Sequence, residues 1–226
     1  MTTLAILTLD CRSLIGEPVA SHFTDDVLYD YINYALADLS KYFPVTKEYA
    51  LSTTLNVRTY DLENDFLDVL SVEFPTSNVP PTYLLRRSYT HPEFWSTNGY
   101  YDIVQSFDDT TTNPPQILIS EKPAASKTIT VKYHGTHNVL TASSDVCTLQ
   151  THLLHLVALF VRWKCWQEMA TKEGIDPDQT KLLAATIEVN AGRAEKAYRT
   201  ALTEARKGAA ESAQVHWHMD DNDRIY

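Results

Sequence analysis

Glycine, cysteine and long apolar runs are scarce in this sequence, and each scarcity excludes a class of protein. The chain of 226 residues has 6 glycines, and none completes a G-x-G-x-x-G, a P-loop or a G-x-S-x-G motif, so the turns that nucleotide sites and serine hydrolases require are missing. Its 3 cysteines are far apart and lack C-x-x-C spacing, which argues against a disulfide framework or a zinc site. No stretch approaches the roughly 18 apolar residues of a membrane span, and no basic segment precedes an apolar one at the start. We therefore expect neither export nor membrane insertion, and synthesis in a reducing cytoplasm.

Positive charge is scarce as well. The formal net charge is −10, and the lysines and arginines form no basic arm or stripe in any part of the chain. Tight binding of DNA or RNA requires clustered Lys and Arg to neutralise phosphates. The sequence excludes a nucleic-acid-binding protein of that kind, although it is compatible with DNA passing close by without binding.

What the sequence does contain begins with two helical patterns. Residues 3–15 place apolar side chains at helical spacing, and Gly16 stands in the position of a C-terminal cap. In the second pattern, Thr24 is a good N-cap, acidic residues follow it, an apolar stripe runs on, and Pro44 ends the element. We expect both helices to pack against other helices.

From residue 46 the pattern changes to short β-branched and aromatic runs separated by turn residues. The runs are "YALSTTLNV", "FLDVLSVEF", "TYLLRR", "YYDIVQSF", "QILIS" and "TITVKYH". Runs of this length and spacing are typical of a β-sandwich or small barrel of about six or seven strands. We predict a β-rich domain over residues 46–140, inserted into a helical protein.

Helical patterns return after residue 141. A run capped by Ser143 or Ser144 reaches Lys172 and is apolar on nearly every face, which predicts a central buried helix. A further helix is predicted from an N-cap at Asp176 to about residue 212, roughly 50 Å at about 1.5 Å per residue. The fold class is therefore α+β: a bundle of about four helices (residues 1–45 and 141–213), the β insertion, and an extended C-terminal tail (residues 214–226).

Few residues are arranged for chemistry. His152 and His155 lie at i, i+3 without the glutamate of a metalloprotease motif, and the acidic residues 61–68 read as a polar loop. Cys165 lies in the apolar run and is expected to be a core thiol. We expect no catalysis, no cofactor and no metal ion.

Two segments indicate interfaces. The stretch "YTHPEFWSTNGYY" has more aromatic side chains than a solvated loop needs, and aromatic residues are enriched at interfaces. This candidate interface with a neighbour or partner protein comprises Tyr89, Phe94, Trp95, Tyr100 and Tyr101. The tail "VHWHMDDNDRIY" has too few aliphatic residues to fold alone, so it is either disordered or ordered by a partner.

The segment "FTDDVLYDYINYALADLSKYFP" resembles the signature helix of the head-to-tail adaptor (connector) proteins of tailed bacteriophages. The resemblance covers residues 3–44 and 145–212 and the tail, whereas the β insertion departs from the simple all-helical adaptors. It implies a structural virion protein, made in the host cytoplasm and located in the neck at the portal vertex. Such a protein forms a ring of about twelve copies between the portal and the tail, nozzle or neck protein, and extends the channel for double-stranded DNA ejection.

The resemblance also implies a role for the tail. Residues 214–226 would dock between portal subunits, through a set comprising His216, Trp217, His218, Asp220, Asp221, Ile225 and Tyr226. An acidic channel wall would repel the phosphates of passing DNA. The alternative interpretation is a carbohydrate- or host-binding β-module of a phage tail protein that uses the aromatic stretch.

Overall fold

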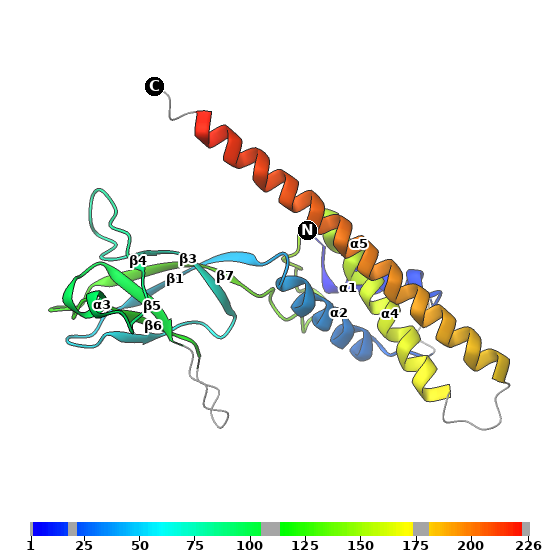
Figure 1. The fold of residues 1–226 in the computed structure, drawn as a ribbon. Helices are drawn as coiled ribbons and strands as arrows, with labels where there is room; N and C mark the ends of the chain where they lie inside the picture. Colours follow the sequence, from blue (N-terminus) through cyan, green and yellow to red (C-terminus); the bar gives the residue numbers. More distant parts are fainter. Residues whose placement is uncertain (1, 18–21, 105–113, 174–180, 223–226) are drawn as a thin grey trace. The chain divides into compact units, whose positions relative to one another are not determined.

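The computed structural model describes residues 2–17, 22–104, 114–173 and 181–222 of the chain. Side chains of the last two helices are described as far as Thr171 and from Thr186 to Ala209. The chain divides into a helical unit, Met1–Phe43 with His137–Tyr226, and a β unit, Pro44–Thr136 (Figure 1). The sequence places the same two divisions at residues 45/46 and 140/141.

The described part of the helical unit contains four α-helices, and the third of them contacts each of the others. They are α1 (Leu4–Ile15), α2 (Asp25–Ser40), α4 (Leu154–Glu173) and α5 (Lys181–Asn222). A 3₁₀ turn, Thr151–Leu153, leads into α4. The prediction of a central helix is confirmed, because α4 packs against α1, α2 and α5.

The expected helix caps are present. Gly16 has a left-handed backbone, φ 84°, and its N–H donates to the carbonyls of Arg12 and Ser13, so it closes α1. The Thr24 hydroxyl accepts a hydrogen bond from the Val27 N–H at 3.5 Å, at the start of α2. These local signals alone determine where α1 ends and where α2 begins.

The start of the central helix differs from the prediction. Ser143 and Ser144 do not cap it, because Asp145 folds the segment into a turn whose carboxylate accepts the N–H groups of Thr141 and Ala142, both at 2.8 Å. Val146 then forms a bridge with Thr3. Backbone groups used in these contacts cannot join a helix, so no helix starts at Ser143 or Ser144, and α4 begins at Leu154 after the 3₁₀ turn.

The last helix is longer than predicted. It continues to Asn222 instead of ending near residue 212, so residues 214–222 are helical and not extended. The physical reason is local: no proline or glycine follows Gly208, and Ala, Glu and Gln in this stretch favour helix. The predicted start at Asp176 lies outside the described residues.

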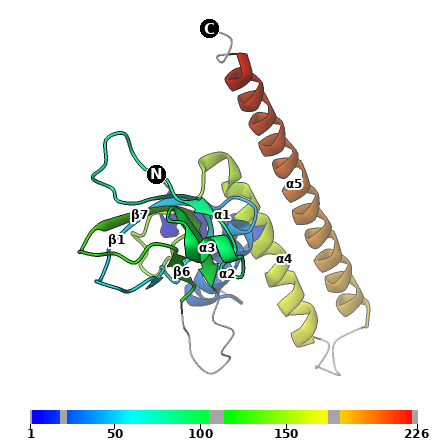
Figure 2. The same cartoon turned by 60° about the vertical axis from the view of Figure 1, so that its left-hand side comes forward.

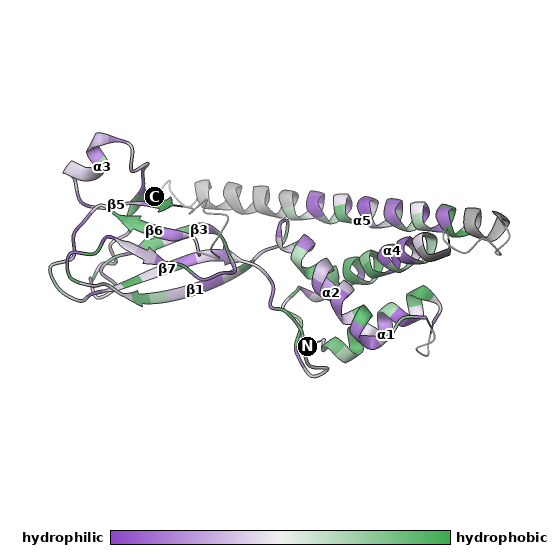
Figure 3. Ribbon diagram, turned by 90° about the horizontal axis from the view of Figure 1, so that it is seen from below, coloured by the Kyte–Doolittle hydropathy of each residue, from purple (hydrophilic) through white to green (hydrophobic). Residues whose placement is uncertain are grey.

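The core of the helical unit lies between α1, α2 and α4, with α5 covering one side (Figures 2 and 3). It is built from Leu4, Leu7, Leu28, Ile32, Leu36, Leu39, Leu156, Val157, Phe160, Val161 and Tyr198, among others. Along α5, Tyr198 is buried and Ala201, Leu202 and Ala205 pack against this core. None of the helices within the described ranges combines the length and hydropathy needed to span a membrane.

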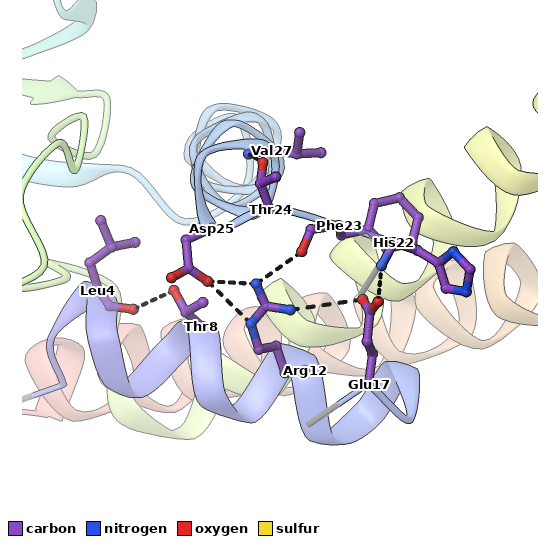
Figure 4. A network of polar contacts seen from close by, with 9 residues as sticks. All are labelled: Leu4, Thr8, Arg12, Glu17, His22, Phe23, Thr24, Asp25 and Val27. Atoms are coloured by element: carbon purple, nitrogen blue, oxygen red, sulfur yellow. Dashed lines mark hydrogen bonds and ion pairs between the residues drawn. The ribbon is translucent and has the colours of Figure 1, made fainter. Parts of the chain in front are cut away.

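An ionic network joins α1 to α2 (Figure 4). The Arg12 guanidinium is 4% exposed and contacts the Asp25 carboxylate at 2.5 Å and the Phe23 carbonyl at 3.0 Å. Its other terminal nitrogen lies 3.8 Å from the Glu17 carboxylate, which accepts the His22 N–H. One buried cation therefore fixes the position of α1 against the start of α2.

The β unit consists of two packed sheets, as the sandwich prediction requires. The first has the order β1 (Val45–Ser52), β7 (Thr128–Gly135), β3 (Phe66–Glu73), and all its pairs are antiparallel. The second has the order β2 (Thr59–Asp61), β6 (Gln116–Ile119), β5 (Tyr100–Val104), β4 (Leu85–Arg86), in which only the β4–β5 pair is parallel. The shared core contains Val72, Phe74, Tyr101, Ile117, Ile119, Ile129, Val131 and Tyr133.

Two elements of the β unit escaped the sequence analysis. Strand β2 spans three residues, too few for an alternating pattern to appear. Helix α3 (Pro92–Ser96) lies within the aromatic stretch that we interpreted as a loop. His91 caps it, accepting the Glu93 N–H at 3.3 Å, and Pro92 occupies its first turn.

Candidate interaction surfaces

A groove opens on the helical unit where α2, α4 and α5 meet. Its volume is about 560 Å³, within the range of about 300–1,000 Å³ that is common for binding pockets. It is lined by Tyr34, Ala37, Asp38, Lys41, Tyr42, Phe160, Trp163, Lys164, Tyr198, Arg199 and Leu202. We call this surface the aromatic groove.

Three rings form the floor of the aromatic groove. Trp163 and Tyr198 stack with ring centroids 6.0 Å apart, and Phe160 meets both edge-on, at 5.5 Å and 5.3 Å. The rings come from two antiparallel neighbours, α4 and α5, so their packing holds these helices together.

A polar contact joins the α5 wall of the groove to the α2 wall. The Tyr198 hydroxyl donates to the Asp38 carboxylate at 2.7 Å, and Lys41 contacts the same carboxylate at 3.1 Å. Burial, and then the hydrogen bond to Asp38, raise the pKa of Tyr198 far above its ordinary value. The phenol therefore stays protonated and remains a hydrogen-bond donor.

The rim of the groove is basic, unlike the chain as a whole. The Lys164 ammonium lies 4.3 Å from the centre of the Trp163 ring, and the Arg206 guanidinium lies 4.6 Å from that of Tyr42. Arg199 adds a third cation and pairs with Glu195 at 2.7 Å. With Tyr34 60% and Tyr42 39% exposed, the groove presents aromatic surface between positive charges.

The predicted aromatic interface of the β unit is only partly at the surface. Phe94 is fully buried, Tyr101 belongs to the β core, and the Tyr100 hydroxyl donates to Glu93 at 3.0 Å. Tyr89 and Trp95 are about half exposed, and the Trp95 indole N–H donates to the Tyr89 carbonyl at 2.7 Å. Of the predicted interface, Tyr89 and Trp95 are therefore the side chains that a partner could contact.

Arg58 lies over the exposed indole. Its guanidinium carbon is 5.0 Å from the centre of the Trp95 ring. The nearby Arg87 pairs with Glu93 and lies 4.9 Å from the centre of the Tyr100 ring. The Tyr89–Trp95 surface thus combines aromatic area with a cation, a pairing that is common at interfaces.

Two of the carboxylates in residues 61–68, Asp61 and Asp65, make separate structural contacts. Asp65 pairs with Lys47 at 2.5 Å and accepts the Tyr133 hydroxyl at 3.0 Å, whereas Asp61 accepts the Gln116 amide at 2.6 Å. Within the described ranges, no three metal-ligating side chains come together. The fold uses these carboxylates as structural contacts.

The histidine pair and Cys165, which the sequence analysis considered for chemistry, also have structural surroundings. His155 contacts the His152 carbonyl at 2.9 Å on the exposed side of α4. Burial raises the pKa of the Cys165 thiol to about 12, and the nearby Cys11 contributes to the shift. This thiol lies in the helical core, as the sequence predicted.

The comparison with known families gives one match. The family model described as "SU10 adaptor protein" matches residues 1–219. The chain belongs to the SU10 adaptor protein family. The family's name indicates a bacteriophage adaptor protein. Membership in the family therefore implies that this chain is a structural component of the virion. No curated protein matches the chain.

The match to the SU10 adaptor family includes both units, so the β insertion belongs to the family pattern. It also includes three of the predicted docking residues, His216, Trp217 and His218. These residues, with Asp220 and Asp221, lie on helix α5, and their side chains fall outside the described set. Ile225 and Tyr226 lie outside the described residues altogether.

The aromatic groove of this SU10-family adaptor was not found from the sequence. Its signal in the sequence is weak: Tyr34 and Asp38 are four residues apart on α2 and Lys41 is the C-cap of that helix, which is a normal spacing for a solvated helix face. Only the convergence of three helices turns that face into a groove wall.

Proposed function

We propose that this adaptor assembles into a ring of about twelve copies between the portal and the tail or neck protein, and that the ring extends the DNA channel. Family membership supports an adaptor role, and the geometry of α5 supports assembly. The last described α5 side chain packed on the core is Ala205, yet the helix continues to Asn222, about 25 Å farther at about 1.5 Å per residue. A helix that leaves its own core is well placed to lie along another subunit.

The acidity of the chain supports passage of DNA without binding. With a net charge of −10, a ring of many copies carries a large negative charge. Carboxylates within a Debye length of about 8 Å of the DNA repel its phosphates and offer no counterion release. The proposed channel wall is therefore one along which DNA slides.

The proposed portal contact is the C-terminal segment, residues 214–226. Trp217 and Tyr226 supply aromatic area, and Asp220, Asp221 and Asp223 supply charge for basic groups on the portal. Each single contact is small, but a ring engages all its copies at once, which multiplies a weak affinity.

The assembly is tested with the full-length chain, alone and mixed with portal-bearing, DNA-filled heads. Native mass spectrometry and negative-stain images are expected to show closed rings of about twelve copies in solution or at the portal vertex. Chains that remain monomeric in both settings overturn the proposal.

The portal contact has its own test. Deleting residues 214–226 is expected to leave the melting temperature almost unchanged, since the described core ends at Ala205, and to abolish attachment to heads. A comparison variant carries Asp220→Asn and Asp221→Asn, which remove two negative charges and keep the aromatic side chains, and it is expected to weaken attachment only in part. Undiminished docking by the truncated chain would show that the contact lies elsewhere.

The Tyr89–Trp95 surface favours a second role in the same protein. Its half-exposed rings and its cation suit contact with a tail protein or a neighbouring subunit, and exposed tryptophan also suits stacking on sugars. Titration with oligosaccharides distinguishes the two. Saturable quenching of Trp95 fluorescence, lost in Trp95→Ala, would favour a carbohydrate-binding module.

A further inference from the structure

A second exposed apolar surface of the helical unit lies on α1. Ile6 is 47% and Leu9 63% exposed, and Asp10 and Ser13 lie on the same helix face at i, i+3, i+4 and i+7. Val146 is 42% exposed and lies next to the start of α1, because it forms a β-bridge with Thr3. We call Ile6, Leu9 and Asp10 the α1 face.

Among the residues that the structure describes, no element of the helical unit covers the α1 face. The other side of the helix, Leu4, Leu7 and Cys11, is buried in the core against α2 and α4. The Arg12–Asp25 ion pair fixes the rotation of α1, so Leu9 is held outward. An isolated exposed leucine is ordinary, but Ile6 and Leu9 lie about one turn apart on the exposed face of a helix whose other face is packed in the core.

The α1 face and the aromatic groove are separate surfaces. The groove is lined by α2, α4 and α5 and by no residue of α1. Figure 3 shows α1 and α5 on opposite sides of α4. A surface that meets a different surface on the next copy forms a head-to-tail contact, which closes into a ring when the rotation allows.

The two surfaces are complementary in charge, and one is convex whereas the other is concave. The α1 face is a convex helix with two aliphatic side chains and one carboxylate, Asp10. The groove is concave and aromatic, and its lining carries three cations, Lys41, Lys164 and Arg199, against the one carboxylate of Asp38. Lys41 pairs with Asp38 and Arg199 pairs with Glu195, so the lining keeps a net positive charge. In a chain of net charge −10, this groove is a place where an acidic helix face is attracted.

We propose that the α1 face of one copy docks into the aromatic groove of the next copy, and that this contact closes the ring. The inference rests on the proposed ring and names its subunit interface. Leu9 and Ile6 lie against Tyr34, Tyr42 and the floor of stacked rings, and Asp10 faces Lys41 and Lys164 at the rim. Acidic residues elsewhere on the chain remain free to line the channel.

Cross-linking tests the contact directly in the full-length chain. The double variant Leu9→Cys with Tyr34→Cys places one thiol on each surface, while the three native cysteines are buried. In assembled rings, in solution or on portal-bearing heads, a short bis-maleimide is expected to give a ladder of dimers, trimers and larger species. Each single-cysteine variant is the matched control, and it is expected to give only uncross-linked chains on a denaturing gel.

Complementation tests the direction of the contact. Leu9→Arg spoils only the α1 face, and Tyr34→Arg spoils only the groove, and the two arginines repel each other where the changed surfaces meet; both native side chains are about 60% exposed, so both variants should fold. Each variant alone is expected to lose assembly at least tenfold. An equimolar mixture retains one intact contact per pair and is expected to stop at a complex of two chains. Val189→Arg, at an exposed apolar position of α5 outside both surfaces, is the control and should assemble normally.

The outcomes separate this inference from the proposed function. Rings that form without a cross-linked ladder, or with dimers only, overturn the α1–groove contact and leave the ring proposal standing. Failure of the wild-type chain to form rings in either setting overturns both. A ladder together with complementation by the mixture establishes the head-to-tail interface.

Discussion

The Tyr198 hydroxyl on α5 donates a hydrogen bond of 2.7 Å to the Asp38 carboxylate on α2, and this contact ties together two helices separated by most of the chain. Helix α4 packs against both of them, and its Phe160 and Trp163 contact the Tyr198 ring. Tyr198 therefore serves both the core, through its ring, and the groove, through its hydroxyl.

Replacing Tyr198 with Phe separates these two contributions. The ring packing remains, but the hydrogen bond to a charged acceptor is lost, which costs about 1–2 kcal/mol of unfolding free energy. Tyr198→Ala also opens a cavity and is expected to cost about 3–5 kcal/mol. Urea unfolding followed by circular dichroism measures both, with Tyr34→Phe as a control that should change nothing because Tyr34 is 60% exposed.

Replacing Arg12 with Met breaks the network between α1 and α2. The change removes the Arg12 cation that lies 3.8 Å from the buried Glu17 carboxylate, and removing one partner of a buried pair is strongly destabilising. Since the Asp25 side chain is 59% exposed and can be hydrated, we expect a loss of about 2–3 kcal/mol. Arg193→Met, on an exposed part of α5, is the matched control; an equal loss there would contradict the role of the network.

Two glycines are expected to respond oppositely to alanine. A methyl group at Gly192, within α5, meets nothing within 4 Å, so Gly192→Ala should stabilise the helix by about 0.5–1 kcal/mol. A methyl group at Gly135 would lie 3.1 Å from Asp65 and from Tyr133, so Gly135→Ala should lower stability. Thermal melts of the two variants beside the parent chain are sufficient, and a shift of the same sign in both would refute the prediction.

The thiols should be unreactive in the folded protein. Burial raises the pKa of Cys11 and of Cys165 to about 12, and burial also raises that of Cys147. Because the thiolate reacts, little labelling by a thiol reagent is expected at pH 8, whereas all three cysteines should react in urea. Raising the pH toward 12 increases the thiolate fraction, so labelling should accelerate in that direction. Rapid labelling of one thiol at pH 8 would show that its surroundings open.

The two units are expected to fold separately. Each has its own apolar core, and the chain passes between them at Phe43/Pro44 and Thr136/His137. Replacing residues 44–136 with a short Gly/Ser linker should therefore preserve a helical far-UV circular dichroism spectrum and a cooperative melt. Loss of helical signal in that variant would mean that the β unit is needed for the helical core.

Local chemistry made much of this fold readable from the sequence. Gly16 and Thr24 end and begin helices through their own backbone and side-chain groups, and alternating runs around Val72 and Val131 have the period of strands. The helical patterns on both sides of the strands determined the α+β class and the two units. The same segment that carries the second helix also carried the resemblance to adaptor proteins.

Other features depend on contacts between residues far apart in the chain. Asp145 and the Thr3–Val146 bridge delay α4, and neither effect is visible in a window of neighbouring residues. Phe94 and Trp95 are adjacent in sequence, yet packing buries the first and exposes the second. The aromatic groove joins Tyr34, Trp163 and Tyr198 from three helices. Sequence periodicity determines which face of a helix is apolar, but only tertiary packing decides which apolar side chains meet and which remain available to a neighbour.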